Sequence, residues 1–194
     1  GYKQENLALL KSNLEKLNIK ATIFDSDIFA VCDKISKENP CYLCARMRRG
    51  WLYSKAKELG CNKIALGHHF DDVIETIMLN ILYAGEYKTM MPKLKSTNFE
   101  GLELIRPFYY VHESDIKDWV KYLDLKFLNC ACSVTDGSVE SKRKEVKELI
   151  KTLKKDNPNV DIHILRSSFN VNLDSIIGYK DNGEEYSFLD DYGK

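Results

Sequence analysis

Apolar residues recur at helical spacing in several segments of the chain. Leucines at every third or fourth position near the start predict a helix over about residues 4–17. The same spacing predicts helices over 44–59, 73–82, 116–123 and 139–155. Gly60 follows the predicted helix over 44–59 and is a natural stop for it. In the last helix, the residues expected to be buried are Val146, Leu149, Ile150 and Leu153.

Short apolar runs between these helices predict strands. They read "IKATIF" at 19–24, "NKIALG" at 62–67, "LELIRPF" at 102–108, "LKFL" at 125–128 and "VDIHIL" at 160–165. Helices that alternate with strands indicate the α/β class, a parallel sheet covered by helices on both faces. We find no internal repeat and no long linker, and predict one α/β domain over 1–132 followed by a basic helix and C-terminal extension over 133–194.

Composition adds few constraints. A hydrophobic content of 44% and a charged content of 30% are ordinary for a soluble globular protein of 194 residues. The sequence has neither a run approaching the ~20 apolar residues of a membrane helix nor a secretory signal at its start. We therefore expect a cytoplasmic protein, in which disulfides are not favoured and the isolated Cys32 and Cys61 are buried.

Charge is uneven along the chain although the formal net charge is zero. Residues 142–155 carry seven basic and two acidic side chains, whereas 181–191 carry five acidic and no basic ones. Such a basic helix usually presents a solvated face to water. The sharper alternative is contact with an RNA backbone through residues such as Lys142 and Arg143.

The sequence "GHHFDD" occupies the position where ligands bind in an open parallel sheet. Gly67 ends a strand and Asp71 or Asp72 begins a helix, so the motif lies at the carboxyl edge of the sheet. His68 and His69 can offer hydrogen bonds to a nucleotide, and the aspartates can hold Mg²⁺ on phosphates.

A purely structural interpretation of this motif is also open. Asp72 precedes Glu75 by three residues, as in an N-terminal capping arrangement, so Glu75 can simply close the helix. Adjacent residues of one turn cannot all face one pocket, so His68 and His69 are expected to divide between site and scaffold.

Two pairs of cysteines point to metal or redox chemistry. Cys41 and Cys44 precede a helix, whose N-terminus favours thiolate, and Cys130 and Cys132 follow a predicted strand. Because consecutive parallel strands end at the same edge of a sheet, both pairs can meet near the histidine–aspartate turn. Four thiolates suit Zn²⁺ and three suit a [4Fe–4S] cluster with one open iron; the alternative is two unrelated pairs of buried thiols.

Three arginines follow the first cysteine pair on the same predicted helix. Arg46, Arg48 and Arg49 can clamp phosphate or an RNA backbone beside a cysteine site. For any one of them, exposure on a solvated helical face is the ordinary alternative.

Five segments together closely resemble the tRNA 2-thiocytidine synthetase family of the PP-loop ATPases. They read "CYLCARMRRGWLY", "KIALGHHFDDVIETIMLN", "MMPKL", "IRPFYYV" and "FLNCAC", and the likeness runs from near Gly1 to about Cys132. The resemblance implies the Rossmann-like fold of the adenine nucleotide alpha-hydrolase superfamily for this domain.

The resemblance also implies a reaction and its residues. In that family ATP adenylates the C2 oxygen of a tRNA cytidine, and sulfur then replaces the activated oxygen. Matching positions place a [4Fe–4S] cluster on Cys41, Cys44 and Cys130, with Cys132 as the competing third ligand because the later pair is spaced Cys-x-Cys. The ATP site would include Gly67 and His68, with Asp71 as the catalytic or Mg²⁺-binding carboxylate and Asp72 as the second.

One family motif does not occur in this sequence. Family members begin with a strand and an "SGGxDS"-type loop that binds pyrophosphate, and Gly1 matches a position just after their second strand. We expect the chain to be a fragment that does not adenylate RNA alone.

The implied partners are tRNA and a sulfur donor such as a cysteine desulfurase, with a homodimer favoured by exposed sheet edges. Two alternatives remain: a zinc-stabilised, non-catalytic RNA-binding module, and a sister PP-loop enzyme such as a 2-thiouridine or lysidine synthetase.

Overall fold

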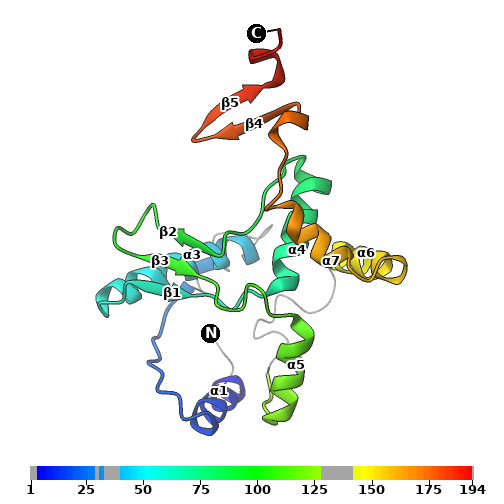
Figure 1. The fold of residues 1–194 in the computed structure, drawn as a ribbon. Helices are drawn as coiled ribbons and strands as arrows, with labels where there is room; N and C mark the ends of the chain where they lie inside the picture. The colour runs from blue at the N-terminus through cyan, green and yellow to red at the C-terminus, as the bar shows by residue number, and fades with distance from the viewer. Residues whose placement is uncertain (1–3, 29–30, 33–39, 128–141, 194) are drawn as a thin grey trace.

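Helices predominate in the chain (Figure 1). The structure, a computed structural model, describes residues 4–28, 31–32, 40–127 and 142–193. Its longer helices are α1 (Gln4–Lys16), α3 (Pro40–Glu58), α4 (Phe70–Leu79), α5 (Glu113–Tyr122), α6 (Lys142–Asp156) and α7 (Val160–Ser167). A π-helical turn, η1 (Asn80–Ala84), extends α4. The five helices predicted from apolar spacing are thus confirmed over the described residues. None of the described helices is long and apolar enough to cross a membrane.

A three-stranded sheet lies at the centre of the α/β part. Its strands are β1 (Lys63–Ala65), β2 (Lys93–Lys95) and β3 (Glu103–Ile105), in the order β1-β3-β2. β1 and β3 run parallel, whereas β2 is antiparallel to β3. The α/β class is confirmed, and the sheet of the described residues is mixed rather than all parallel. Tyr53 of α3 packs with Leu102 and Leu104 in a small hydrophobic cluster at this sheet.

The larger hydrophobic cluster surrounds α4. Val73 and Ile77 of α4 are almost fully buried against Val146 and Ile150 of α6 and Leu165 of α7. The helices on either side of the predicted boundary at 132/133 therefore share one core, and the boundary itself falls in 128–141, outside the described ranges. Leu149 and Leu153 of α6 are 38% and 39% exposed, so the prediction that they are buried is wrong.

Two of the predicted strands are not strands. Residues 19–24 are irregular and have no neighbouring strand among the described residues, and a segment without a ladder partner is not part of a sheet. Residues 160–165 form most of α7, because Val160, Ile164 and Leu165 turn inward at helical rather than alternating spacing. The predicted strand at 125–128 is irregular over 125–127, and Leu128 lies outside the described part.

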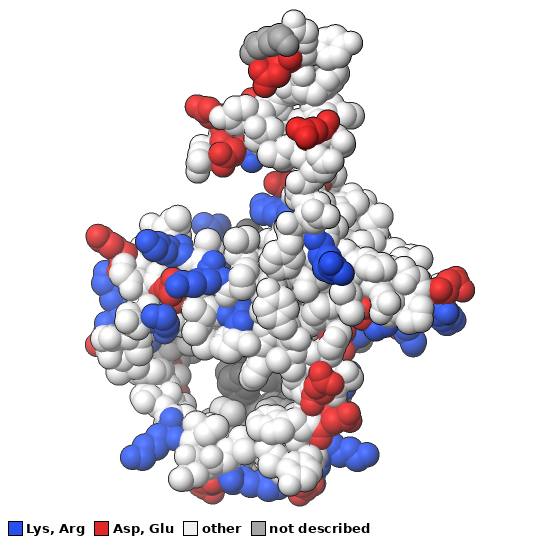
Figure 2. All heavy atoms as spheres, viewed as in Figure 1, with Lys and Arg blue, Asp and Glu red and all other residues white. Residues whose placement is uncertain are grey.

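A β-hairpin follows α7 and projects from the body (Figure 1). Its strands are β4 (Gly178–Asp181) and β5 (Glu184–Ser187), joined at Asn182 and Gly183, which both have positive φ. Such φ values suit a tight hairpin turn. The sequence predicted only a polar tail here. Figure 2 shows acidic side chains gathered on this projection.

Candidate functional site

The carboxyl ends of two parallel strands define the candidate site. The backbone N–H of Leu66 donates to the carbonyl of Ile105 at 2.9 Å, so β1 and β3 end side by side. The next residues are Gly67 and His68 after β1 and Arg106 after β3. The structure therefore places the histidine–aspartate turn at the sheet edge where the sequence predicted it.

The N-terminus of α4 is closed by Asp72. His69 is the residue before the helix, and its backbone N–H donates to Oδ2 of Asp72 at 3.1 Å. The His69 ring lies between the two carboxylates, with Nε2 3.5 Å from Asp72 and Nδ1 3.7 Å from Asp71. The alternative in which Glu75 closes the helix is therefore wrong, since Asp72 makes that contact.

Asp71 caps a different helix. Its Oδ2 accepts the backbone N–H of Glu113, the first residue of α5, at 2.7 Å. The backbone N–H of Phe70 also donates to the carbonyl of Val111 at 2.9 Å, and its ring packs on His112 with centroids 4.3 Å apart. The turn is thus fixed against the segment that leads into α5, and one oxygen of Asp71 is already engaged.

Arg143 of α6 joins the second carboxylate to a buried one. Its Nη1 lies 3.2 Å from Oδ1 of Asp72 and 2.8 Å from Oε2 of Glu75. Burial raises the pKa of Glu75, and the hydrogen bond and charge of Arg143 oppose that rise. The guanidinium of Arg143 is thus already bound to two carboxylates, and its predicted contact with RNA stays a prediction.

An ion-pair network continues from α4 onto α5 and α6. Glu113 pairs with Lys147 at 2.6 Å and with Lys117 at 3.0 Å. These hydrogen bonds lower the pKa of Glu113 to about 2, against a smaller opposing effect of burial. The acidic side of the site is therefore well neutralised by α6. Lys142, also predicted to bind RNA, pairs with Glu145 at 3.0 Å and lies over the ring of Tyr83.

The other side of the site is basic. Arg106 donates from its backbone N–H to the carbonyl of Pro92 at 2.9 Å and from Nη1 to the carbonyl of Met91. These bonds join the "MMPKL" and "IRPF" segments. Burial lowers the pKa of His68, and the nearby positive charge of Arg106 lowers it further. The His68 ring is therefore predominantly neutral at pH 7. Arg106 was not among the predicted site residues; its signals in the sequence were a cation directly after an apolar strand and its place in the "IRPFYYV" segment.

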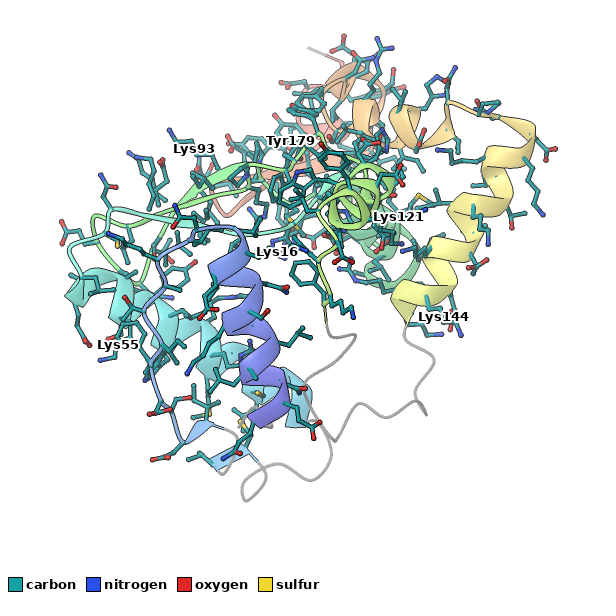
Figure 3. All side chains as sticks on the ribbon, turned by 90° about the horizontal axis from the view of Figure 1, so that it is seen from below. Lys16, Lys55, Lys93, Lys121, Lys144 and Tyr179 are labelled. Atoms are coloured by element: carbon teal, nitrogen blue, oxygen red, sulfur yellow. The ribbon has the colours of Figure 1, made fainter. Side chains whose placement is uncertain are left out.

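The three arginines of α3 lie at exposed positions, which fits the solvated face given as the alternative, and their contact with phosphate or RNA stays a prediction; they are Arg46, Arg48 and Arg49. Figures 1 and 3 place α3 and α6 on different sides of α4. The two basic segments therefore do not form one continuous surface.

The cysteines are only partly described. Cys44 is a free, half-buried thiol near the start of α3, which fits a ligand position. Cys41 lies one turn earlier, and its side chain is outside the described part. Cys130 and Cys132 lie entirely outside the described residues. The convergence of the two pairs therefore stays a prediction. Among the described residues no group of three or more metal-ligating side chains occurs.

The remaining two cysteines differ from each other. Cys32 is buried, as predicted, and its Sγ lies 3.7 Å from Sδ of Met47. Burial raises the pKa of the Cys32 thiol, and the neighbouring Cys44 raises it further. Cys61 follows the end of α3 and is exposed, so the prediction that it is buried is wrong.

Comparison with known proteins finds relatives in sequence and in fold. A PP-loop domain model matches residues 11–153. A curated tRNA-cytidine(32) 2-sulfurtransferase of Geotalea uraniireducens is 37% identical over 174 residues, covering 88% of this chain and 68% of that protein. The chain belongs to the tRNA-cytidine 2-sulfurtransferase family of PP-loop proteins. The resemblance seen in the sequence is thereby confirmed.

Two further relatives bear on the fold and on length. A tRNA-cytidine(32) 2-sulfurtransferase of Aliivibrio fischeri is 42% identical over 153 residues, which are 77% of this chain but 48% of that protein. The solved U34-tRNA thiolase NcsA of Methanococcus maripaludis, with its [4Fe-4S] cluster, superposes with a TM-score of 0.67 at 26% identity, covering 86% of this chain and 56% of the other. The chain thus spans between about half and two thirds of the length of these family members.

Proposed function

We propose that this chain carries the larger part of an ATP-dependent tRNA thiolation site that inserts sulfur at C2 of a cytidine. The observation that carries the proposal is the 37% identity over 174 residues to a sulfurtransferase named for that reaction. The solved thiolase with a [4Fe-4S] cluster supports the same class of chemistry. A tRNA substrate also agrees with the cytoplasmic location expected from the sequence.

The described residues suit the activation half of the reaction. A ring carbonyl oxygen leaves poorly, and its adenylation converts it into a good leaving group. Gly67 and His68 would line the nucleotide, and a neutral His68 can donate a hydrogen bond without adding charge. Asp71 would hold Mg²⁺ through its second oxygen, because the first accepts the N–H of Glu113. Asp72 would act as the supporting carboxylate, held by Arg143.

The sulfur half would depend on cysteines. Cys41, Cys44 and one of Cys130 and Cys132 would hold the cluster, which supplies an open iron to carry sulfide. Cys44, half-buried and free, is the described side chain that supports this arrangement. The sulfur donor, such as a cysteine desulfurase, and a homodimer stay predictions.

The test is anaerobic reconstitution followed by analysis of tRNA nucleosides. The chain is assayed alone and extended at Gly1 by the whole N-terminal segment of a curated relative, from its first strand and "SGGxDS" loop through its second strand, with ATP, Mg²⁺ and sulfide. We expect brown protein, and 2-thiocytidine by mass spectrometry from the extended chain, lost in a Cys44→Ala variant. Colourless protein with tightly bound zinc and no thiolated nucleoside from the extended chain would contradict the proposal. Thiolation by the chain alone would contradict the expected need for the loop.

A further inference from the structure

Arg106 is a half-buried cation without an acidic partner among the described residues. Within this part of the chain its buried Nε makes no hydrogen bond, and its side chain donates to the carbonyl of Met91. No carboxylate in the described part of the chain pairs with it. An arginine remains protonated in proteins, so this charge is desolvated and not neutralised. Burial lowers the pKa of Arg106, which expresses that cost.

The groups around Arg106 add hydrogen-bond donors and positive charge. His68 follows the neighbouring strand, and its Nδ1 is also buried without a hydrogen-bond partner in the described ranges. The positive charge of Arg49 on α3 acts on both, and it lowers the pKa values of His68 and Arg106. Tyr53, one turn after Arg49, is buried beside the sheet and fixes this face of α3 toward the strand ends.

The carboxylate that acts on His68 is already bound to other groups. Asp72 acts on His68, but its oxygens accept the N–H of His69 and bind Arg143. His68 and Arg106 thus follow the adjacent ends of β1 and β3, and the charge of Arg49 acts on both, with no anion from the described residues to neutralise them. A polar, cationic site of this kind is completed by a ligand anion.

We propose that Arg106, with Arg49 and His68, forms a phosphate-binding site that holds the backbone of the substrate RNA beside the reacting cytidine. A guanidinium binds phosphate through two parallel hydrogen bonds, and the Nε of Arg106 has no acceptor among the described residues. Arg46 and Arg48 continue the positive charge along the exposed face of α3, as a polyanion requires and a single nucleotide does not. The choice of RNA rests on the proposed function, and the phosphate of AMP is the other source of the same chemistry.

The test measures binding without ATP, sulfide or turnover. Fluorescence anisotropy with a labelled RNA stem-loop is recorded between 50 and 200 mM salt, and AMP is titrated in parallel by calorimetry. We expect Arg106→Met to weaken RNA binding about ten- to a hundredfold and to reduce the salt slope by about 0.7. Arg106→Lys, which keeps the charge but not the planar fork, should fall between. Arg166→Met, on the exposed face of α7, is the matched control and should change affinity less than about twofold.

Thermal unfolding separates this role from a structural one. Because Arg106 carries an uncompensated charge, Arg106→Met without ligand should unfold at the wild-type temperature or above it. A large loss of AMP affinity with RNA binding intact would assign the same site to the nucleotide phosphate and overturn the RNA assignment. The whole inference is overturned if Arg106→Met binds both ligands as Arg166→Met does, or if it only lowers the unfolding temperature. If the wild-type chain binds RNA, neither of these outcomes for Arg106→Met contradicts the proposed function.

Discussion

Single residues at the site have both structural and chemical duties. Asp71 caps α5 and is the expected catalytic or Mg²⁺-binding carboxylate. Asp72 closes α4 and is held by Arg143. Loss of either side chain therefore removes a helix contact together with a functional group, and suitable substitutions are needed to separate the two effects.

Asp71 permits this separation. Asp71→Asn keeps an oxygen that accepts the N–H of Glu113, whereas Asp71→Ala removes it. We expect the alanine variant to lose about 1 kcal/mol of unfolding free energy and the asparagine variant to lose little, while both lose Mg²⁺-dependent activity. Urea unfolding and the thiolation assay provide the two measurements. Equal stability of both variants would show that the cap contributes nothing.

Glu113 should make stability depend on acid. Its pKa falls from an ordinary 4.5 to about 2 in the folded protein, so its ion pairs stabilise the fold above pH 4.5 and are lost as the pH falls toward 2. After allowance for its half-exposed lysine partners, we expect a contribution of about 1–2 kcal/mol. The difference in unfolding free energy between wild type and Glu113→Gln should shrink over this range. Glu100→Gln, at an exposed position, is the control that should show a constant difference.

At the scale of elements, α4 is central because it contributes both to the candidate site and to the larger hydrophobic cluster. Its first turn carries the site, and its buried side chains pack against α6 and α7. A substitution in α6 that weakens this packing also moves the support of Asp72, because Arg143 belongs to the same helix.

The two faces of α6 provide a matched pair for this packing. Ile150 is 6% exposed and Leu149 is 38% exposed on the same helix. We expect Ile150→Ala to lower the unfolding free energy by about 2–4 kcal/mol because it leaves a cavity against α4, and Leu149→Ala by less than about 1 kcal/mol. Chemical denaturation of both variants measures the difference, and similar losses would contradict the arrangement of this interface.

The sequence predicted the elements better than their environment. Periodicity located α1, α3, α4, α5 and α6, and the strand-end position of "GHHFDD" located the candidate site. It failed for 160–165, where an alternating pattern of apolar residues belongs to a helix packed on α4. It also missed Arg106, because the absence of a partner for a charge depends on distant residues. The neighbours of Asp71 and Arg143 are likewise separated from them in sequence by 42 and by 68 to 71 residues.

At the scale of the whole molecule, the body and the C-terminal hairpin differ in how they are held. β4 and β5 pair with each other, and every residue of both strands is exposed. Tyr179 stacks on Tyr186 across the hairpin with ring centroids 4.8 Å apart. Figure 2 shows basic side chains over the part of the body that holds the sheet and acidic ones on the hairpin.

Local stability should follow this division. A two-stranded hairpin without further packing is only marginally stable in water. We expect amides of residues 178–187 to exchange with deuterium at least about a hundredfold faster than those of 73–77 in α4. Mass spectrometry of exchanged peptides measures this difference. Comparable protection of the two segments would mean that the hairpin is held by a further contact, for example with another copy of the chain.

The position of β1 in the sheet has a consequence for self-association. Within the described ranges β1 pairs with β3 alone, so its other side offers unused amide and carbonyl groups. The exposed apolar side chains of Ile19, Ile23 and Phe24 lie in a segment that also has no strand beside it. Unpaired backbone groups of this kind can pair with an extended segment of another chain. The purified protein should therefore aggregate, measured as turbidity, as its concentration rises. A short soluble peptide that pairs with the free edge of β1 should prevent this turbidity.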